Sequence, residues 1–533
     1  MNFKKYFIII SILFFFLFFF KYYNYNYKFK SNIINNNVIN NIYIKNKKNY
    51  FSKNKQFVII KTDVLLIKIN KFGGDVEKAS LLSYPKKIKS LKPFNLLKQY
   101  KFFTYKAQSG LIGQNGIDNL SNNRPFYKTI SNFYKLNKFK NKITVPMIYI
   151  SKNGVLYKKI FIFHRNKFLI NVNYFIKNLS KKKITIKLIS QLKQTINKKK
   201  KNKNNIEKCN FNLYRGSSFS TDKFKFKKYS FDDIKKSNLL LKTKNGWITM
   251  MQRYFASCWI PKIKGNKIFY TRNSINGNAY IGYKSDNFII NSGKKQTFNS
   301  FLWIGPKFID KMSFISKNLG LTVDYGRFWF ISKFLLNTLK LINKHTNNYG
   351  ISLIIITFII RAILYPINKI QYTYITKMNL LQPKINKINK KFKNKKNEKR
   401  KNIIKLYKKA KINPFGGFLS IIIQMPIFLS LYYMIIYSIE LRHANFIFWI
   451  KDLSSYDPYY ILPIFMGITS FFVQKTYPNK NYDLNKNQNL NLIPIIFTIF
   501  FLCLPSGLII YYIINNLLTI LQQKFINKFF IKK

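Results

Sequence analysis

Acidic residues, histidine and cysteine are scarce in this sequence, and each scarcity excludes a class of site. The 533 residues include 16 Asp and Glu, three His and three Cys, against 94 Lys and Arg. The histidines form no HExxH pair and the cysteines form no CxxC pair, so the sequence predicts no metal site. Glycine-rich phosphate loops, a GxSxG turn and the kinase motifs are also missing. We therefore expect no catalytic residues, no cofactor and no small-molecule substrate.

The large positive charge has a compositional explanation. A formal net charge of +78 would ordinarily indicate binding to nucleic acid or to an anionic surface. Lys, Asn, Ile, Phe and Tyr crowd every region of this chain, however, as is typical of an AT-rich genome, and the lysines are not gathered in one tract. We therefore expect no specific nucleic-acid target.

The N-terminus resembles a membrane-targeting segment. Two lysines precede an apolar run from Tyr6 to Phe20, as in a secretory signal. The run is followed by KYYN rather than by the small residues of a cleavage site, so we favour an uncleaved signal-anchor over residues 1–23 to a cleaved signal. Residues 24–56 are rich in Asn, Lys and Tyr without a helical or strand period, which indicates a linker.

Residues 57–318 are expected to form a large, mostly β domain. The stretch VIIKTDVLLIKINKFGGDVEKASLLSYP alternates between apolar and polar residues, and later stretches such as KITVPMIYI and KKKITIKLIS are short and rich in β-branched residues. This pattern predicts a β-sandwich or a large sheet. Two of the cysteines, Cys209 and Cys258, lie here; they could pair, but we favour two buried free thiols.

Residues 319–348 contain a predicted amphipathic helix. Apolar side chains recur at intervals of three and four residues, and lysines and asparagine occupy the opposite face. The helix either lies in the membrane surface or packs on the core of the β domain, and its position directly before an apolar segment favours the membrane surface. The apolar face consists of Phe328, Ile331, Phe334, Leu335, Leu339 and Ile342.

The rest of the chain is expected to lie largely in a membrane. With the anchor, the predicted spans number six, and the last five form an α-helical core whose final four occupy residues 414–526. These five spans are placed at residues 349–367, 416–438, 459–473, 491–504 and 507–523. Residues 527–533 form a basic tail.

A predicted helical hairpin separates the first two of these spans. In residues 368–413, apolar side chains are spaced three and four residues apart on both sides of the polar stretch KNKKNEK. This spacing favours two helices that close on a coiled-coil-like seam. Two independent amphipathic helices on the membrane surface are the alternative.

Loop charge predicts the orientation. Residues 368–413 carry 16 Lys and Arg and a single acid, whereas residues 439–458 are nearly neutral. The positive-inside rule therefore places the first loop in the cytoplasm and the second outside. Six spans then put both termini in the cytoplasm and the β domain in the periplasm.

The spans contain a positive charge and no negative one. Arg361 lies in the apolar stretch ITFIIRAILYP, and no Asp or Glu falls in the last five spans. An arginine at a helix centre costs about 2.5 to 3.5 kcal/mol on insertion scales. To snorkel to the inner membrane surface, the Arg361 side chain would have to reach about 9 to 12 Å. We therefore favour a hydrated groove, in which the charge is stabilised by water, lipid phosphate, dipoles or an incoming partner.

Other polar residues in the spans are candidates for the same groove. Thr357 shares a helix face with Arg361, and Tyr512 shares one with Asn516. For Gln424, an interhelical hydrogen bond is an equal alternative. The predicted groove residues are Arg361, Thr357, Gln424, Ser430, Tyr512 and Asn516.

These segments resemble the YidC-type membrane protein insertases of the YidC/Oxa/Alb family, in their long Gram-negative form. The resemblance runs from Tyr349 to Gln522 and extends to the predicted β domain through VIIKTDVLLIKINKFGGDVEKASLLSYP, GWITMMQRYFASCWIP and LTVDYGRFWFIS. In the membrane part it rests on IIITFIIRAILYPINKIQYTYITKMNLLQPKI, NPFGGFLSIIIQMPIFLSLYYMI, DLSSYDPYYILPIFMGITSFFVQK and NNLLTILQQK.

The resemblance implies a function and partners. It implies an insertase and chaperone of the bacterial inner membrane, with Arg361 as the groove arginine that attracts acidic residues of a client's outer tail. It implies a mutarotase-like β-sandwich in the periplasm without sugar chemistry. Implied partners are nascent membrane proteins, the Sec translocon, membrane lipids and, as a further candidate, the ribosome. A solute or ion transporter with a periplasmic binding domain is the alternative function, which the missing intramembrane carboxylates disfavour.

Overall fold

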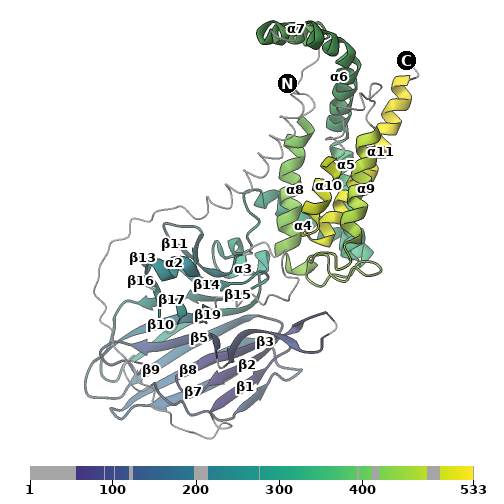
Figure 1. Cartoon of the computed structure of the whole chain (residues 1–533). Coiled ribbons are helices and arrows are strands. Elements are labelled where there is room, and N and C mark those ends of the chain that lie inside the picture. The colour runs from purple at the N-terminus through teal and green to yellow at the C-terminus, as the bar shows by residue number, and fades with distance from the viewer. Residues whose placement is uncertain are drawn as a thin grey trace. The chain divides into compact units, whose positions relative to one another are not determined.

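The computed structural model describes residues 56–531 except 89, 101, 119–123, 197–213, 275–276, 393–394, 411–418 and 477–491. The predicted signal-anchor and nearly all of the predicted linker lie outside the described residues. Strands occupy the chain from Phe57 to Pro306, and long helices occupy it from Trp329 to Ile531 (Figure 1).

The strands form two sheets that are almost entirely antiparallel. The larger has the order β13-β16-β17-β10-β5-β4-β3-β2-β1-β6, with β18 paired to β10, and the smaller has the order β12-β11-β14-β15-β19-β9-β8-β7. The strands of the larger sheet are β1 (Phe57–Lys61), β2 (Leu65–Asn70), β3 (Asp75–Pro85), β4 (Pro93–Tyr100), β5 (Phe103–Ile112), β6 (Phe133–Lys135), β10 (Ile184–Thr195), β13 (Leu240–Thr243), β16 (Lys267–Asn273), β17 (Asn278–Ser285) and β18 (Phe288–Ile290). Those of the smaller sheet are β7 (Lys142–Ile150), β8 (Val155–His164), β9 (Leu169–Asn178), β11 (Gly216–Thr221), β12 (Lys227–Ser230), β14 (Gly246–Met251), β15 (Phe255–Pro261) and β19 (Lys295–Pro306).

Alternating side chains build the core of this β region. In β8 and β9 every second residue is buried, as the period of a strand with one face on a core requires. Trp247 and Trp259 are among the largest fully buried side chains of the region. The prediction of a mostly β region is therefore confirmed. Cys258 is buried and free, whereas Cys209 lies outside the described residues.

One buried position of β8 holds a lysine. Lys159 is fully buried, and its ammonium donates to the carbonyl oxygens of Gly74 at 2.9 Å, Ser109 at 3.0 Å and Gly73 at 3.3 Å. These carbonyls lie in and beside β3 and β5 of the other sheet. Lys159 therefore joins the two sheets through polar contacts inside the core.

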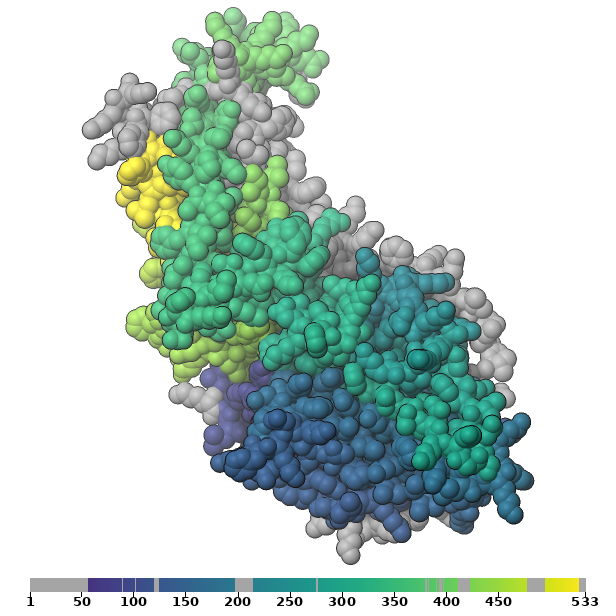
Figure 2. Space-filling view, turned by 180° about the vertical axis from the view of Figure 1, so that it is seen from behind, coloured from purple at the N-terminus to yellow at the C-terminus, as the bar shows by residue number. Residues whose placement is uncertain are grey.

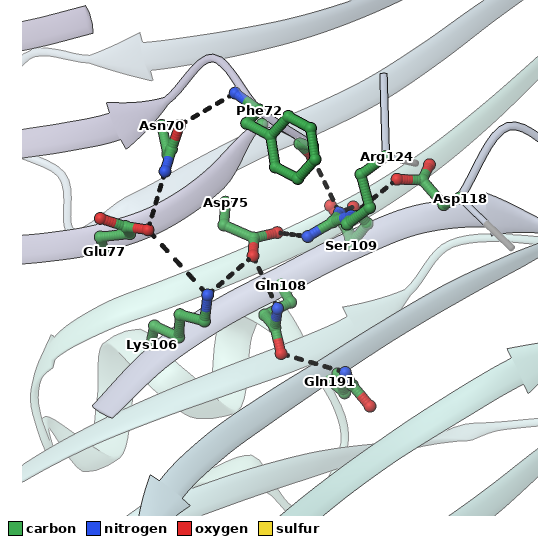
Figure 3. Close-up of polar contacts among 12 residues, drawn as sticks. Asn70, Phe72, Asp75, Glu77, Lys106, Gln108, Ser109, Asp118, Arg124 and Gln191 are labelled. Carbon is green, nitrogen blue, oxygen red and sulfur yellow. Dashed lines mark hydrogen bonds and ion pairs between the residues drawn. The ribbon is translucent and has the colours of Figure 1, made fainter. Parts of the chain in front are cut away.

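A network of ion pairs lies beside this lysine, because Arg124 and Lys159 both donate to the Ser109 carbonyl. Figure 3 shows the ion pairs of the network. Arg124 pairs with Asp75 at 2.7 Å and with Asp118 at 2.9 Å, and Lys106 pairs with Asp75 at 3.2 Å. Both aspartates are buried, and buried carboxylates need such charged partners. Burial opposes ionisation of Asp75, but the neighbouring Arg124 and Lys106 outweigh it and lower the pKa of its carboxyl.

The helical region follows. Its long helices are α4 (Trp329–Thr346), α5 (Tyr349–Ile363), α6 (Tyr365–Lys391), α7 (Lys396–Lys409), α8 (Leu419–Tyr437), α9 (Ile461–Thr476), α10 (Leu492–Phe501) and α11 (Ser506–Ile531). Helix α11 packs on α9, α5 and α8, α10 packs on α9, and α4 packs on α5 and α8. Helices α6 and α7 contact each other and lie at one end of the helical region (Figures 1 and 2). Short helical segments lie at α2 (Phe231–Lys236), α3 (Ile309–Ile315), η2 (Leu319–Thr322) and η4 (Ile439–Leu441).

The helix that carries Arg361 is interrupted, whereas the sequence predicted one continuous span over residues 349–367. Helix α5 ends at Ile363, and α6 begins at Tyr365 with a bend of 63° between them. Pro366 explains the break, because it has no N–H to bond the Ala362 carbonyl four residues earlier, and in a continuous helix its ring would clash with that carbonyl.

Within the described residues, no single helix has both the length and the apolarity to cross a bilayer. Helix α5 and the start of α6 reach that criterion together as a bent pair, and α8 and α9 contain shorter apolar stretches. The number of spans therefore stays a prediction.

Helix α4 divides its apolar side chains between two environments. Leu335 and Leu339 of the predicted apolar face are buried, whereas Phe334 is 68% exposed. The helix packs on α5 and α8, and it leaves Trp329 and Phe330 exposed as well. One face thus contacts α5 and α8, and another exposes apolar side chains; its place in the membrane surface stays a prediction.

Candidate functional site

Arg361 lies in the last turn of α5 and is held by α11. Its Nε donates to Oδ1 of Asn515, and its Nη2 donates to the Asn515 carbonyl oxygen at 3.0 Å and to Oγ1 of Thr519. The sequence predicts that water, lipid phosphate, dipoles or an incoming partner stabilise this charge. The structure supplies neutral dipoles: two residues of a neighbouring helix accept hydrogen bonds from the guanidinium.

These acceptors solvate the arginine without neutralising it. An amide oxygen, a backbone carbonyl and a hydroxyl carry partial negative charge but no formal charge. The carboxyl end of α5 adds the negative end of its helix dipole, because Arg361 lies two residues before the helix ends. The site can therefore keep a positive charge while its desolvation is offset.

Asn515 and Thr519 were missing from the predicted groove set. They lie four residues apart and so share one face of α11, and Tyr511 lies a further four residues before them. Polar residues repeating every fourth position in an apolar helix were the available signal. The sequence alone did not say which neighbouring helix that face would meet.

Gln424 of α8 contacts the same face of α11. Its side chain hydrogen-bonds Tyr511, which is buried and is also near enough to Arg361 to feel its charge. The interhelical hydrogen bond that we considered for Gln424 is therefore present.

Tyr512 and Asn516 face other helices. Asn516 donates from Nδ2 to the hydroxyls of Thr469 at 3.1 Å and Ser470 at 3.0 Å, both on α9. The ring of Tyr512 packs on Phe501 of α10 and Phe428 of α8, with centroid distances of 4.8 and 5.6 Å. The two side chains lie on one face, as predicted, but that face packs against protein.

The remaining predicted residues are buried and hydrogen-bonded to backbone. Thr357 donates to the Leu353 carbonyl at 2.7 Å within α5. Ser430 donates to the Pro426 carbonyl at 2.7 Å, and its own carbonyl accepts from Ser332 of α4 at 2.9 Å. The six predicted residues thus occupy several helix contacts rather than a single cluster. In the described part of the chain, His, Cys, Asp and Glu form no group that could hold a metal ion.

Sequence comparisons decide the family. The model of the YidC periplasmic domain matches residues 58–338, and that of the 60Kd inner membrane protein matches residues 341–533. The membrane protein insertase YidC of Buchnera aphidicola subsp. Acyrthosiphon pisum (strain APS) is 47% identical over 479 residues, covering 89% of this chain and 90% of that relative. The chain belongs to the YidC family of membrane protein insertases.

The family assignment rests on the sequence matches alone. A crystal structure of an active YidC insertase has 17% sequence identity and a TM-score of 0.38, covering 88% of this chain and 92% of that one. A galactose mutarotase related enzyme from Lactobacillus acidophilus has 7% identity and a TM-score of 0.29, covering 46% and 97%. YidC membership confirms the main functional prediction, an inner-membrane insertase with a periplasmic domain.

In this YidC family member, hydrogen bonds to a buried carboxylate order the loop over residues 439–458. Asp457 is fully buried and accepts hydrogen bonds from Trp449 Nε1 at 3.0 Å and from the backbone N–H of Leu462 at 2.8 Å. A buried carboxylate at the start of α9 also suits the positive end of that helix. The loop is thereby fixed to the beginning of α9.

Proposed function

We propose that Arg361 is the positive centre of a hydrophilic groove, and that it draws the acidic outer tail of a client into the membrane core of this insertase. The supporting observation is the set of neutral acceptors on α11, which stabilises the guanidinium and leaves its formal charge in place. With no acidic residue in the predicted spans, a carboxylate on a client is the natural transient partner.

The groove that we propose follows the face of α11 that carries Tyr511, Asn515 and Thr519. Gln424 and Arg361 both contact this face, and Thr357 lies one turn before Arg361 on α5. We assign Ser430, Tyr512 and Asn516 to helix packing beside the groove, because their contacts are with neighbouring helices.

Unsatisfied polar atoms support hydration of the inner part of α11. Among the described residues, Nε2 of Gln522 and Oε1 of Gln523 are buried and have no hydrogen-bond partner. Buried polar groups are almost always hydrogen-bonded to protein or to water. Water at this end of α11 would satisfy them and would give the groove its polar character.

The expected strength of the client contact suits transient binding. Two opposite charges 4 Å apart attract by about 1 kcal/mol in water and by about 4 kcal/mol near a protein surface. An attraction in this range can orient an acidic tail and still release it. Partition of apolar client segments into lipid, together with the membrane potential at about 2.3 kcal/mol per charge per 100 mV, would then supply the drive.

The remaining family expectations are part of the same proposal. We propose six spans, with both termini in the cytoplasm and the periplasmic domain outside. We also propose contacts of the insertase with the Sec translocon and with the ribosome. The 16 basic residues against one acid in residues 368–413 support a cytoplasmic position of this segment.

Replacement of Arg361 tests the groove. In cells depleted of their own insertase, Arg361→Ala is expected to lower insertion of an acidic-tailed reporter about tenfold, which corresponds to about 1.4 kcal/mol of lost attraction. Arg361→Lys is expected to retain much of the activity, because the charge remains. Full activity of both variants would instead favour a snorkelling arginine without a role in insertion, and normal insertion without the protein would exclude the insertase role for that client.

A further inference from the structure

Two consecutive asparagines of α11 have separate partners. Asn515 accepts hydrogen bonds from Arg361 of α5, whereas Asn516 donates to Thr469 and Ser470 of α9. Consecutive residues of a helix point in directions about 100° apart, so one asparagine meets α5 and the other meets α9. Their chemistry is identical, and only their contacts distinguish them.

The contacts of Asn515 and Thr519 define the orientation of the guanidinium. Arg361 uses both Nε and Nη2, two donors of its rigid planar fork, on this side. The Thr519 hydroxyl donates to the Asn515 carbonyl at 2.7 Å, so its oxygen is left to accept from Arg361. This ordered set of bonds fixes the plane of the guanidinium against α11.

Asn515 and Thr519 also carry no formal charge. An aspartate has nearly the size and shape of an asparagine, and at residue 515 it would place a carboxylate on the Arg361 fork. The resulting ion pair would be at least as well bonded as the present contact, but it would cancel the formal charge. The site therefore anchors the guanidinium firmly through α11 partners that carry no formal negative charge.

We propose that Asn515 and Thr519 are positioning residues that hold Arg361 toward the groove and preserve its positive charge for clients with acidic tails. The proposal rests on the groove function proposed above and deepens it. It makes the selection of acidic tails depend on two neutral residues of α11 that act through their hydrogen bonds with Arg361.

The test uses two reporter clients that differ only in whether their outer tail carries acidic or neutral side chains. Both are expressed with the full-length insertase in depleted cells, and the membrane level of each insertase variant is measured in parallel. Asn515→Asp is expected to lower insertion of the acidic-tailed client about tenfold more than it lowers insertion of the neutral-tailed client. Asn515→Leu and Thr519→Val are expected to lower insertion of the acidic-tailed client several-fold. Thr519→Ser keeps the hydroxyl and is expected to insert this client as the wild type does.

Asn516→Leu is the matched control, because it removes an amide of the same helix that does not contact Arg361. This variant is expected to change insertion of both clients by the same factor. Equal effects of Asn515→Asp on the two clients, or an unchanged tail preference in both Asn515→Asp and Thr519→Val, would overturn the positioning role. Arg361→Ala separates this failure from that of the groove itself: an unchanged tail preference in Arg361→Ala would overturn both proposals together.

Discussion

Arg253 caps the carboxyl end of α8, since its Nε donates to the carbonyl oxygen of Ile436 at 2.9 Å. Its Nη2 also donates to the carbonyl of Ser454 at 2.7 Å, and the neighbouring Tyr254 donates to the Ser454 hydroxyl at 2.8 Å. The last carbonyls of a helix have no partner within that helix. A side chain from between β14 and β15 supplies one here, and so ties the periplasmic domain to α8 and to the loop over residues 439–458.

Removal of this cap is expected to loosen the attachment of the periplasmic domain. Arg253→Ala takes away two hydrogen bonds from a charged donor, each worth about 1.5 to 3 kcal/mol. We expect a lower midpoint of thermal unfolding for the full-length protein in detergent and faster proteolysis between the two regions. Arg272→Ala is the control, because Arg272 is exposed and stacks on Tyr280 of the same sheet. A midpoint equal to that of the wild type would show that the cap is energetically unimportant.

Lys159 is expected to be required for the stability of the periplasmic domain. Lys159→Met keeps much of the volume but leaves three buried carbonyls without their donor and the ion-pair network without a positive charge. Breaking a buried charge network in this way costs about 3 kcal/mol or more. Chemical unfolding can be followed by fluorescence, because Trp247, Trp259 and Trp303 are buried in this domain.

Lys158→Met is the matched control for that measurement. Lys158 precedes Lys159 in β8, and the alternation of the strand directs it to the other face of the sheet. We expect a change of less than about 0.5 kcal/mol, as for other substitutions away from buried networks. Similar losses in both variants would mean that the buried ammonium contributes nothing specific.

The same lysine predicts a pH dependence. Burial lowers the pKa of Lys159 from 10.5 to about 7, although Asp75 partly opposes the shift. Between these two values the unfolded chain binds a proton that the folded chain does not, so this group makes the free energy of unfolding rise with pH. The rise is at most about 1.4 kcal/mol per pH unit. The measurement is the free energy of unfolding of the wild type and of Lys159→Met between pH 6 and 9. The difference between the two proteins isolates the contribution of Lys159, and a difference that does not change with pH would exclude the titration.

The sequence predicted what its local patterns determine. The alternation of β8 and β9 was sufficient for a mostly β region, and the residue types around Arg361 were sufficient for an unusual charge in an apolar segment. The partners of Lys159 were not predictable, since they are backbone carbonyls of strands far apart in the sequence. Asn515 and Asn516 differ only in direction around α11, so helix packing had to be known to separate them. The break before Tyr365, by contrast, was readable from Pro366.

Gly350 provides a last prediction, because it lies where α5 meets the loop over residues 439–458. A Cβ on Gly350 would lie 2.0 Å from Cδ2 of Phe446. Asn348 fixes both segments, since its side chain accepts from the Gly350 N–H at 2.8 Å and donates to the Phe446 carbonyl at 3.2 Å. Alanine is favoured over glycine in a helix by about 1 kcal/mol, but the clash with the ring outweighs this gain.

Gly350→Ala is therefore expected to destabilise the protein by about 1 to 3 kcal/mol, as overpacking does elsewhere. In a protein that already carries Phe446→Ala, adding Gly350→Ala should cost little free energy of unfolding, because the space of the ring is then available to the new methyl group. Thermal unfolding of the four proteins in detergent gives the coupling energy between the two sites. Additive effects would mean that the loop moves freely away from α5 and that the close approach is not needed.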